Sequence, residues 1–397
     1  MNHQRDIDLR GRRQVVLGLA GLLGAMVSGC AESSTDSSTT PGTTATTGQT
    51  TVPTTSTATP TPGTMPGTTL YVYRNHTMKV DDLAWSPDSQ YILSASSSTV
   101  SQVPGGIPAQ IYLWKARTGE TNTAFTSTLN NITPLVTPLA WSSDGTMIAL
   151  SGQPASGDGS VETSIHDAHT GKRTGGYTSR NGFIRQLTWS PDSHLFAIAG
   201  GHDVEICDAS TGTKVLSYPT SLSVTDTTHA SNVVAWSPDG NVIASAAAQD
   251  GHSLQFWNAH TGAPLYYFSG PKPDVAVWSP NGKMIATGKA FTQPPQVLDS
   301  TTGETLLTCQ TNLTTLGLHG NVLLFIPHSI TWSPDSKYIA VANDQNQVQI
   351  WHVATQKLAY TYTKHSAPVS AVAWSPDGSC IASASYDKTV QVWQAIQ

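Results

Sequence analysis

The sequence predicts an all-β fold, a seven-bladed β-propeller built from four-stranded blades. The first observation is a Trp-Ser pair that recurs seven times, with its tryptophan at Trp85, Trp141, Trp189, Trp236, Trp278, Trp332 and Trp374. The second is the spacing, since residues 70–397 divided by seven give units of about 47 residues, near the length of one propeller blade. The third is the absence of helical periodicity from the repeats, whose apolar runs are short and β-prone.

Each unit is expected to contain four strands. The first strand ends at the tryptophan, and a Ser-Pro-Asp-Gly type turn leads into the second. The second strand begins around an apolar residue seven positions later: Ile92, Ile148, Phe196, Ile243, Ile285, Ile339 and Ile381. The third strand ends at Trp114, His166, Cys207, Trp257, Leu298, Trp351 and Trp393. A turn with a threonine, usually followed by glycine, then leads to a fourth β-prone run such as residues 265–268.

The two ends of the repeat region predict how the ring closes. The last unit stops after its third strand at Trp393, whereas residues 70–73 form a β-prone run that precedes the first unit. We expect this N-terminal strand to pair with the last blade as its fourth strand. Such pairing removes an open sheet edge that would otherwise favour association.

Residues 1–29 have the pattern of a signal peptide. Three arginines at positions 10–13 precede an uncharged apolar run over residues 15–27, which is too short to span a hydrocarbon core of about 30 Å. The run ends in Val-Ser-Gly-Cys30, which resembles a bacterial lipobox. The resemblance implies cleavage before Cys30 and a lipid on its sulfur. The Arg12-Arg13 pair also resembles a twin-arginine export signal. The alternative is an ordinary cleaved secretory peptide in which Cys30 is incidental.

Residues 30–69 are expected to be a disordered tether. Serine and threonine make up 22 of the 39 residues from 31 to 69, and large apolar residues are nearly absent. Such a composition cannot bury enough surface to offset the entropy of ordering the chain. A flexible coil of this length has a root-mean-square span of about 35 Å. The expected location is therefore the extracytoplasmic side of the cell membrane, with the propeller held by a lipid anchor.

Composition excludes several classes of function. The chain has 20 basic and 26 acidic residues and a net charge of −6, so no cationic surplus is available for a nucleic-acid backbone. The four cysteines, Cys30, Cys207, Cys309 and Cys380, are too few and too scattered for a disulfide framework or paired zinc ligands. Cys207 and Cys380 fall at strand positions and are expected to be inert buried thiols.

Residues with catalytic or metal-binding potential are few. His166 with Asp167 and His169, and His202 with Asp203, could be metal ligands, but both groups fall where blade turns are expected. Glycine-rich stretches lack the strand-loop-helix context of a phosphate site. We therefore expect no catalytic residue, no metal site and no cofactor.

The repeats resemble those of the WD-repeat propeller family. The last unit carries Trp374-Ser-Pro-Asp, Ile381-Ala-Ser and Val390-Gln-Val-Trp393, and the resemblance covers residues 70–397. It implies a hydrogen-bonded cluster inside the last blade, formed by His365, Ser383, Asp387 and Trp393. Blades two, three and five depart from the pattern with His166, Cys207 and Leu298 in place of tryptophan, so apolar packing is expected there. TolB-like propellers share Trp-Ser-Pro-Asp-Gly and are the closest alternative family.

Loop lengths indicate which face binds partners. The turn between first and second strands is constant, whereas the connection between second and third strands varies and is long at residues 97–110 and 151–161. Up-and-down connectivity places the long connections on one rim, the variable rim, and the tether on the opposite, constant rim. Loops on a rigid scaffold commonly carry function. The resemblance implies that four residues face outward on the variable rim: His202, Gln249, Asn343 and Tyr386.

The predicted function is a non-catalytic scaffold for protein–protein interaction, tethered to the membrane, that binds an unidentified protein or peptide on the variable rim. The alternative is an extracytoplasmic propeller enzyme or small-ligand sensor, TolB-like or hydrolase-like, that uses the central channel. That alternative requires titratable residues from several blades to converge on the axis. A permanent component of an envelope complex is a third interpretation.

Overall fold

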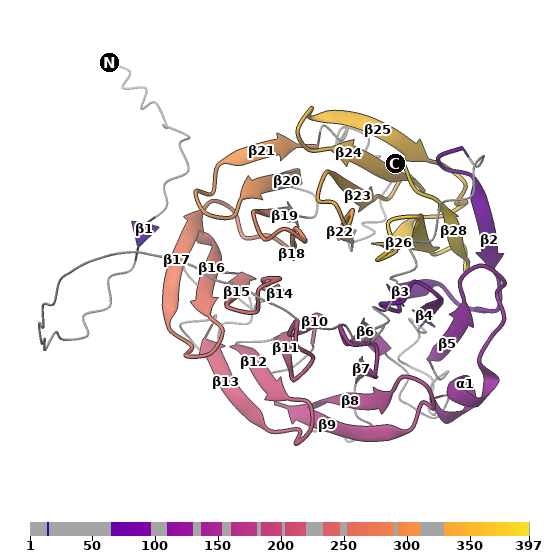
Figure 1. Cartoon of the computed structure of the whole chain (residues 1–397), viewed down its shortest axis with the longest axis horizontal. Helices are drawn as coiled ribbons and strands as arrows, with labels where there is room; N and C mark the ends of the chain where they lie inside the picture. Colours follow the sequence, from indigo (N-terminus) through magenta and orange to yellow (C-terminus); the bar gives the residue numbers. More distant parts are fainter. Residues whose placement is uncertain are drawn as a thin grey trace, which may run out of the picture. The chain divides into compact units, whose positions relative to one another are not determined.

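The computed structural model describes residues 14–15, 65–96, 109–129, 136–152, 160–180, 184–200, 203–219, 233–246, 252–289, 293–309 and 329–396. The described residues form seven separate antiparallel sheets arranged as blades in a ring (Figure 1). The predicted seven-bladed, all-β propeller is confirmed. Within the described ranges, no helix is long and apolar enough to cross a lipid bilayer.

Four strand positions repeat around the ring. The innermost strands are β3 (Val80–Trp85), β6 (Val136–Trp141), β10 (Gln186–Trp189), β14 (Val234–Trp236), β18 (Val275–Trp278), β22 (Ile330–Trp332) and β26 (Val369–Trp374). The second strands are β4 (Tyr91–Ser96), β7 (Met147–Gly152), β11 (Leu195–Gly200), β15 (Val242–Ala246), β19 (Met284–Lys289), β23 (Tyr338–Ala342) and β27 (Cys380–Ser385). Every innermost strand thus ends at one of the seven repeat tryptophans.

The outer half of six blades consists of the third and fourth strands, whereas the described part of blade one has only a third strand. The third strands are β5 (Gln110–Lys115), β8 (Val161–Asp167), β12 (Asp203–Asp208), β16 (His252–Asn258), β20 (Gln293–Asp299), β24 (Val348–His352) and β28 (Val390–Gln394). The fourth strands are β9 (Arg173–Ser179), β13 (Lys214–Pro219), β17 (Pro264–Ser269), β21 (Thr305–Thr308), β25 (Lys357–Tyr362) and β2 (Thr69–Tyr73). A two-residue strand, β1 (Gln14–Val15), pairs with the outer edge of β17.

A row of large side chains crosses every blade. In blade one, Trp85 of β3 pairs with Ile92 of β4, which pairs in turn with Trp114 of β5. The same register recurs in the other six blades. All seven central residues of these rows are 0% exposed, and six of the seven innermost tryptophans are buried. The repeat tryptophans are therefore core residues, as their spacing predicts.

The ring closes in blade seven. Strand β2 pairs antiparallel with β28, and Thr69 lies opposite Trp393 while Tyr73 lies opposite Val390. The predicted closure by an N-terminal strand is confirmed. The Tyr73 ring also stacks on Trp114 of blade one, with 4.3 Å between ring centroids. The closing strand therefore packs against the next blade as well as completing its own.

Blade one differs locally from the expected four strands. After β5, a single bridge joins Trp114 to Thr121, and the helix α1 (Thr123–Leu129) follows on the outer side of the sheet. Asn122 accepts the backbone N–H of Phe125 at 3.0 Å and so caps the first turn. Phe125 and Leu129 are both 0% exposed. Burial of these two side chains outweighs the β propensity of the threonines around them.

Side chains three positions before the repeat tryptophan join neighbouring blades. Asp82 accepts the N–H of Leu139 at 3.1 Å, so blade one is linked to blade two. By the same geometry, the Gln186 side chain accepts the N–H of Val234 at 3.2 Å, between blades three and four. In blade six, Ser329 accepts the N–H of Val372 in blade seven at 3.0 Å. These bonds connect innermost strands that belong to different sheets.

Blades one, three and six are also hydrogen-bonded to the blade that precedes each of them in the ring. Their first turns contain Ser89, Ser193 and Ser336 at φ values of 60°, 63° and 62°, where other blades have glycine. Each serine hydroxyl accepts a backbone N–H from the preceding blade, at Asp377, Asp144 and Asn281. The left-handed conformation is unfavourable for serine, and this hydrogen bond offsets part of its cost.

Candidate partner-binding rim

The turns on the constant rim repeat the same hydrogen bond from blade to blade. In every blade, the first residue after the third strand donates its N–H to a carbonyl of the first turn at 2.9 to 3.0 Å. The constant rim therefore holds both the turn between the first and second strands and the turn that follows the third strand. Thr68 accepts the N–H of Gln394 at 2.9 Å, beside Ala395 of this rim, so the strand that closes the ring begins there.

The variable rim brings together the connections between blades and those between second and third strands. Arg185, which leads into blade three, donates its N–H to Ala199 at the end of β11. In blade seven, Tyr386 donates its N–H to Pro368 at 2.9 Å. The central parts of the long connections, residues 97–108 and 153–159, lie outside the described residues.

Two of the four predicted partner-binding residues can be placed. His202 and Gln249 lie outside the described residues. Asn343 is half-buried, and its side-chain oxygen accepts the N–H groups of Gln345 at 3.0 Å and Gln347 at 3.1 Å. Its amide oxygen therefore shapes the turn. Tyr386 is half-buried on the corresponding turn of blade seven, with its ring beside Lys79.

Tyr386 belongs to a charged group at the junction of blades seven and one. The Lys79 ammonium lies 2.5 Å from the Asp81 carboxylate and 4.7 Å from the centroid of the Tyr386 ring. Burial disfavours the charged ammonium, but the bond to Asp81 outweighs it and raises the pKa of Lys79. The lysine is thus held in its charged form on the variable rim.

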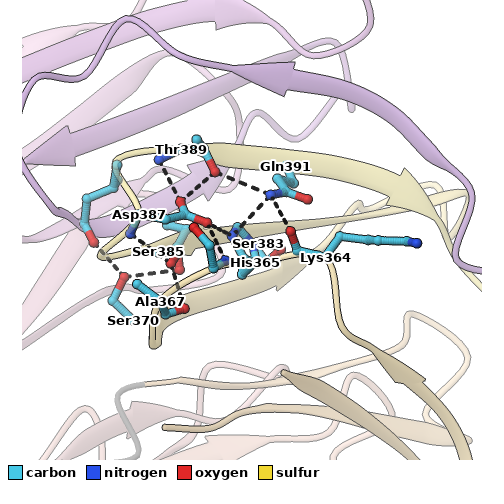
Figure 2. A network of polar contacts seen from close by, with 12 residues as sticks. Lys364, His365, Ala367, Ser370, Ser383, Ser385, Asp387, Thr389 and Gln391 are labelled. Atoms are coloured by element: carbon cyan, nitrogen blue, oxygen red, sulfur yellow. Dashed lines mark hydrogen bonds and ion pairs between the residues drawn. The ribbon is translucent and has the colours of Figure 1, made fainter. Parts of the chain in front are cut away.

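Blade seven contains the polar network that its sequence predicts (Figure 2). The His365 ring bonds to Ser383 through Nε2 and to Asp387 through Nδ1, both at 2.8 Å, and Trp393 donates to Ser383 at 3.2 Å. Burial disfavours the charged carboxylate, but hydrogen bonds from His365, Thr389 and the N–H of Ser366 outweigh it and hold the pKa of Asp387 far below its usual value.

The order of this network matches a hydrolase triad, with a hydroxyl, an imidazole and a carboxylate in sequence. Unlike the residues of a hydrolase triad, these side chains are not accessible to a substrate. Ser383 is 0% exposed and His365 is 5% exposed, and the serine oxygen already accepts the indole N–H of Trp393. A substrate cannot reach a hydroxyl in this position, so the network organises the blade.

Blade one contains a second network that the sequence analysis missed. His76 bonds to Ser94 through Nε2 at 2.8 Å, and Trp114 donates to the same serine at 3.1 Å. Ser96 takes the position of the carboxylate and lies 3.0 Å from His76 Nδ1. Burial lowers the pKa of His76 to about 3, so this histidine is neutral. The available signal was spacing, because His76 precedes Ser94 by 18 residues, as His365 precedes Ser383.

Three histidine and cysteine side chains that could have been metal ligands or nucleophiles are buried inside the blades. His166 is buried, and its two ring nitrogens lie 2.9 Å from the Gly171 carbonyl and from the Ser164 hydroxyl. Cys207 is 0% exposed, and burial raises the pKa of its thiol. Burial also raises the pKa of Cys309, to about 12. Across the described ranges, no three His, Cys, Asp or Glu side chains are grouped to hold a metal ion.

Comparisons with known proteins agree with this architecture. The family model "WD domain, G-beta repeat" matches residues 67–102, 310–352 and 356–394, and the model "Eukaryotic translation initiation factor eIF2A" matches residues 136–302. The chain is 25% identical over 173 residues to "Intraflagellar transport protein 80 homolog" of Rattus norvegicus and of Mus musculus. These residues are 44% of this chain and only 18% of either relative.

The three WD matches fall on blade one and on the last two blades of the ring, which include the two polar networks. Residues 136–302, matched by the other model, run from β6 to the end of β20, so they cover most of blades two to five. The chain is therefore a seven-bladed β-propeller that contains WD40 repeats.

Proposed function

We propose that this protein is a non-catalytic scaffold that binds another protein or a peptide on its variable rim, while a lipid on Cys30 holds it at the extracytoplasmic face of the cell membrane. The observation that supports the scaffold role is where the reactive side chains lie. Ser383, His365 and His76 are buried and hydrogen-bonded inside blades. The ring supplies a platform whose longer connections would define the partner.

The start of the closing strand supports the orientation. This strand begins next to Thr68 at the constant rim, where short turns repeat from blade to blade. A tether from Cys30 that reaches this rim just before β2 would leave the variable rim directed away from the membrane. A partner in the surrounding compartment could then reach the longer connections without displacing the anchor.

Affinity capture from detergent-solubilised membranes tests the scaffold role. The rim variant combines His202→Ala, Gln249→Ala and Tyr386→Ala with Asn343→Asp, because aspartate keeps the oxygen that shapes the Asn343 turn. The matched control changes four exposed residues of the constant rim to alanine: Lys172, Lys283, Glu304 and Lys357.

We expect one stoichiometric partner with the wild type and the control, and its loss with the rim variant at an unchanged melting temperature. Equal recovery of that partner with both variants, or no stoichiometric partner with the wild type, would overturn the proposal.

Intact-mass spectrometry of the membrane-extracted protein tests the anchor. We expect Cys30 to be the first residue and to carry acyl chains, and we expect Cys30→Ala to release the protein from the membrane fraction. An unmodified chain cleaved at another position would remove the lipid anchor from the proposal and leave the scaffold role to the capture experiment.

A further inference from the structure

Three exposed cations lie on backbone segments next to the variable-rim end of β28 in blade seven: Arg74, Lys364 and Lys388. Lys388 precedes β28 by two residues and sits on the turn at a φ of 69°. Tyr73 pairs with Val390, so Arg74, the next residue, leaves the ladder at the end where Lys388 and Thr389 lead into β28. Two of the cations therefore lie on neighbouring strand ends.

Lys364 reaches the same place from the preceding blade. Its backbone carbonyl accepts the side-chain N–H of Gln391 at 3.3 Å, within β28. Figure 2 shows the Lys364 side chain leading away from the polar network rather than into it. The backbones of all three residues thus lie close to the first residues of β28, although they come from three separate stretches of the chain.

Within the part of the chain that the structure describes, these three cations have no counter-ion, unlike several other cations of the ring. Lys115 and Lys337, on the constant rim, pair with Glu120 at 2.7 Å and Asp335 at 3.0 Å. Among the described residues, no ion pair within 4.0 Å involves Arg74, Lys364 or Lys388.

The nearest acid in sequence is Asp387. Its side chain is only 7% exposed, and His365, Ser366 and Thr389 donate to it. Asp344 is exposed on the neighbouring turn of blade six, and no ion pair among the described residues joins it to these cations. The positive charge on this part of the rim therefore faces solvent.

The two rims also differ in the sign of their regular charges. Six of the seven first turns on the constant rim contain an aspartate whose side chain accepts a hydrogen bond from the serine after the repeat tryptophan. These aspartates disfavour an anionic ligand at the first turns, although lysines such as Lys283 and Lys337 share that rim, whereas the blade-seven cations attract one. Such an asymmetry steers an approaching anion to the variable rim.

We propose that Arg74, Lys364 and Lys388 form a binding site for an acidic peptide segment of a partner protein. The inference rests on the proposed scaffold function and adds the chemistry and the place of contact. Tyr386, on the same turn as Lys388, adds a half-buried aromatic ring, one face of which is covered by the Lys79 ammonium. A peptide that alternates acidic and apolar side chains fits this combination.

Fluorescence anisotropy with a labelled hexaglutamate peptide tests the site on the full chain in detergent. The site variant is Arg74→Glu, Lys364→Glu and Lys388→Glu. The matched control is Lys172→Glu, Lys283→Glu and Lys357→Glu on the constant rim, which changes the net charge by the same amount. We expect the wild type and the control to bind, and the site variant to lose at least tenfold in affinity, with weaker binding at higher salt.

Three outcomes would overturn the inference. One is a wild type that does not bind hexaglutamate, and another is an equal loss of affinity in both variants. The third is a site-dependent preference for phosphatidylglycerol vesicles over the peptide, because it would assign the cations to a lipid surface. Capture of the partner separates the two proposals: a partner that still binds the site variant preserves the scaffold and removes this site, whereas absence of any partner removes the scaffold itself.

Discussion

The carboxylate of Asp82 in blade one accepts the backbone N–H of Leu139 in blade two at 3.1 Å. Its equivalents in blades three and six, Gln186 and Ser329, make the same link with neutral groups. Burial raises the pKa of Asp82 from 3.8 to about 7, and the charge of Asp81 adds to the rise, although N–H donors from Leu139 and Leu83 oppose it. Only this one of the three links depends on pH.

Asp82→Asn should raise stability at neutral pH and flatten its pH dependence. The unfolded carboxyl titrates near 3.8 and the folded one near 7, so the wild type loses stability as pH rises between these values, by at most about 1.4 kcal/mol per pH unit. Asparagine keeps the acceptor and removes the charge. Urea unfolding at pH 5 and pH 7.5 measures the effect. Gln186→Glu should make stability fall with rising pH in the same way, through the link from blade three. If stability depended on pH equally in the wild type, Asp82→Asn and Gln186→Glu, the assignment to Asp82 would be wrong.

Asp387→Asn should have the opposite pH signature. The pKa of Asp387 is depressed in the folded state, so its contribution is present above the unfolded pKa near 3.8 and is lost as pH falls below it. We expect a loss of about 1 to 3 kcal/mol at pH 7, because His365 and the neighbouring donors lose a charged acceptor. The difference in melting temperature between the wild type and Asp387→Asn should be smaller at pH 3 than at pH 7. Asp344→Asn, on the exposed turn of blade six, serves as control and should change stability by less than about 0.5 kcal/mol.

Trp236→Ala should cost about 3 to 5 kcal/mol of unfolding free energy. Trp236 is 8% exposed and faces Ile243 in the row of large side chains that crosses blade four. Leu358→Ala removes a side chain that is 45% exposed and should change stability by less than about 0.5 kcal/mol. Chemical denaturation of the two variants side by side gives the comparison, and equal stabilities would refute the core assignment.

Gly212→Ala should destabilise the protein more than Gly240→Ala does. Both glycines have positive φ, at 67° and 77°, so alanine is strained at either position by about 1 to 2 kcal/mol. A methyl group at Gly212 would also collide with the Gly176 carbonyl of the neighbouring blade, whereas at Gly240 the nearest atom is Pro191 Cδ at 3.8 Å. The collision should add about 1 to 3 kcal/mol. Equal melting temperatures for Gly212→Ala and Gly240→Ala would show that blades two and three can move apart at this point without loss of stability.

Local sequence patterns specified the blades because the strands that form one sheet are close in the chain. The spacing from Trp85 to Ile92 is set by one turn, so the sequence alone predicts their pairing. The closure of β2 on β28 was also predictable, because each of the two strands lacked a partner. The helix α1 was not predictable in this way, since its threonine-rich segment becomes helical only where Phe125 and Leu129 are buried against blade one.

The links between blades could not be predicted from local spacing. Asp82 and Leu139 are separated by 57 positions, and nothing in either local sequence identifies the other as its partner. The same holds for the blade-seven cations, because Arg74 meets Lys388 only when the ring closes. Of the predicted rim residues, Tyr386 lies beside this cluster, whereas Asn343 uses its amide oxygen within its own turn.

Closure of the ring by β2 also determines how the domain bears mechanical force. A pull on the chain ahead of Thr69 runs along β2, parallel to a ladder that extends from Thr69 opposite Trp393 to Tyr73 opposite Val390. If the opposing force acts at the variable rim, the rungs of this ladder are loaded together in shear. If it acts on the chain beyond Trp393, which leaves from the same end of the antiparallel ladder as Thr69, the rungs open one after another. The load that the closing strand bears thus depends on which rim a partner holds.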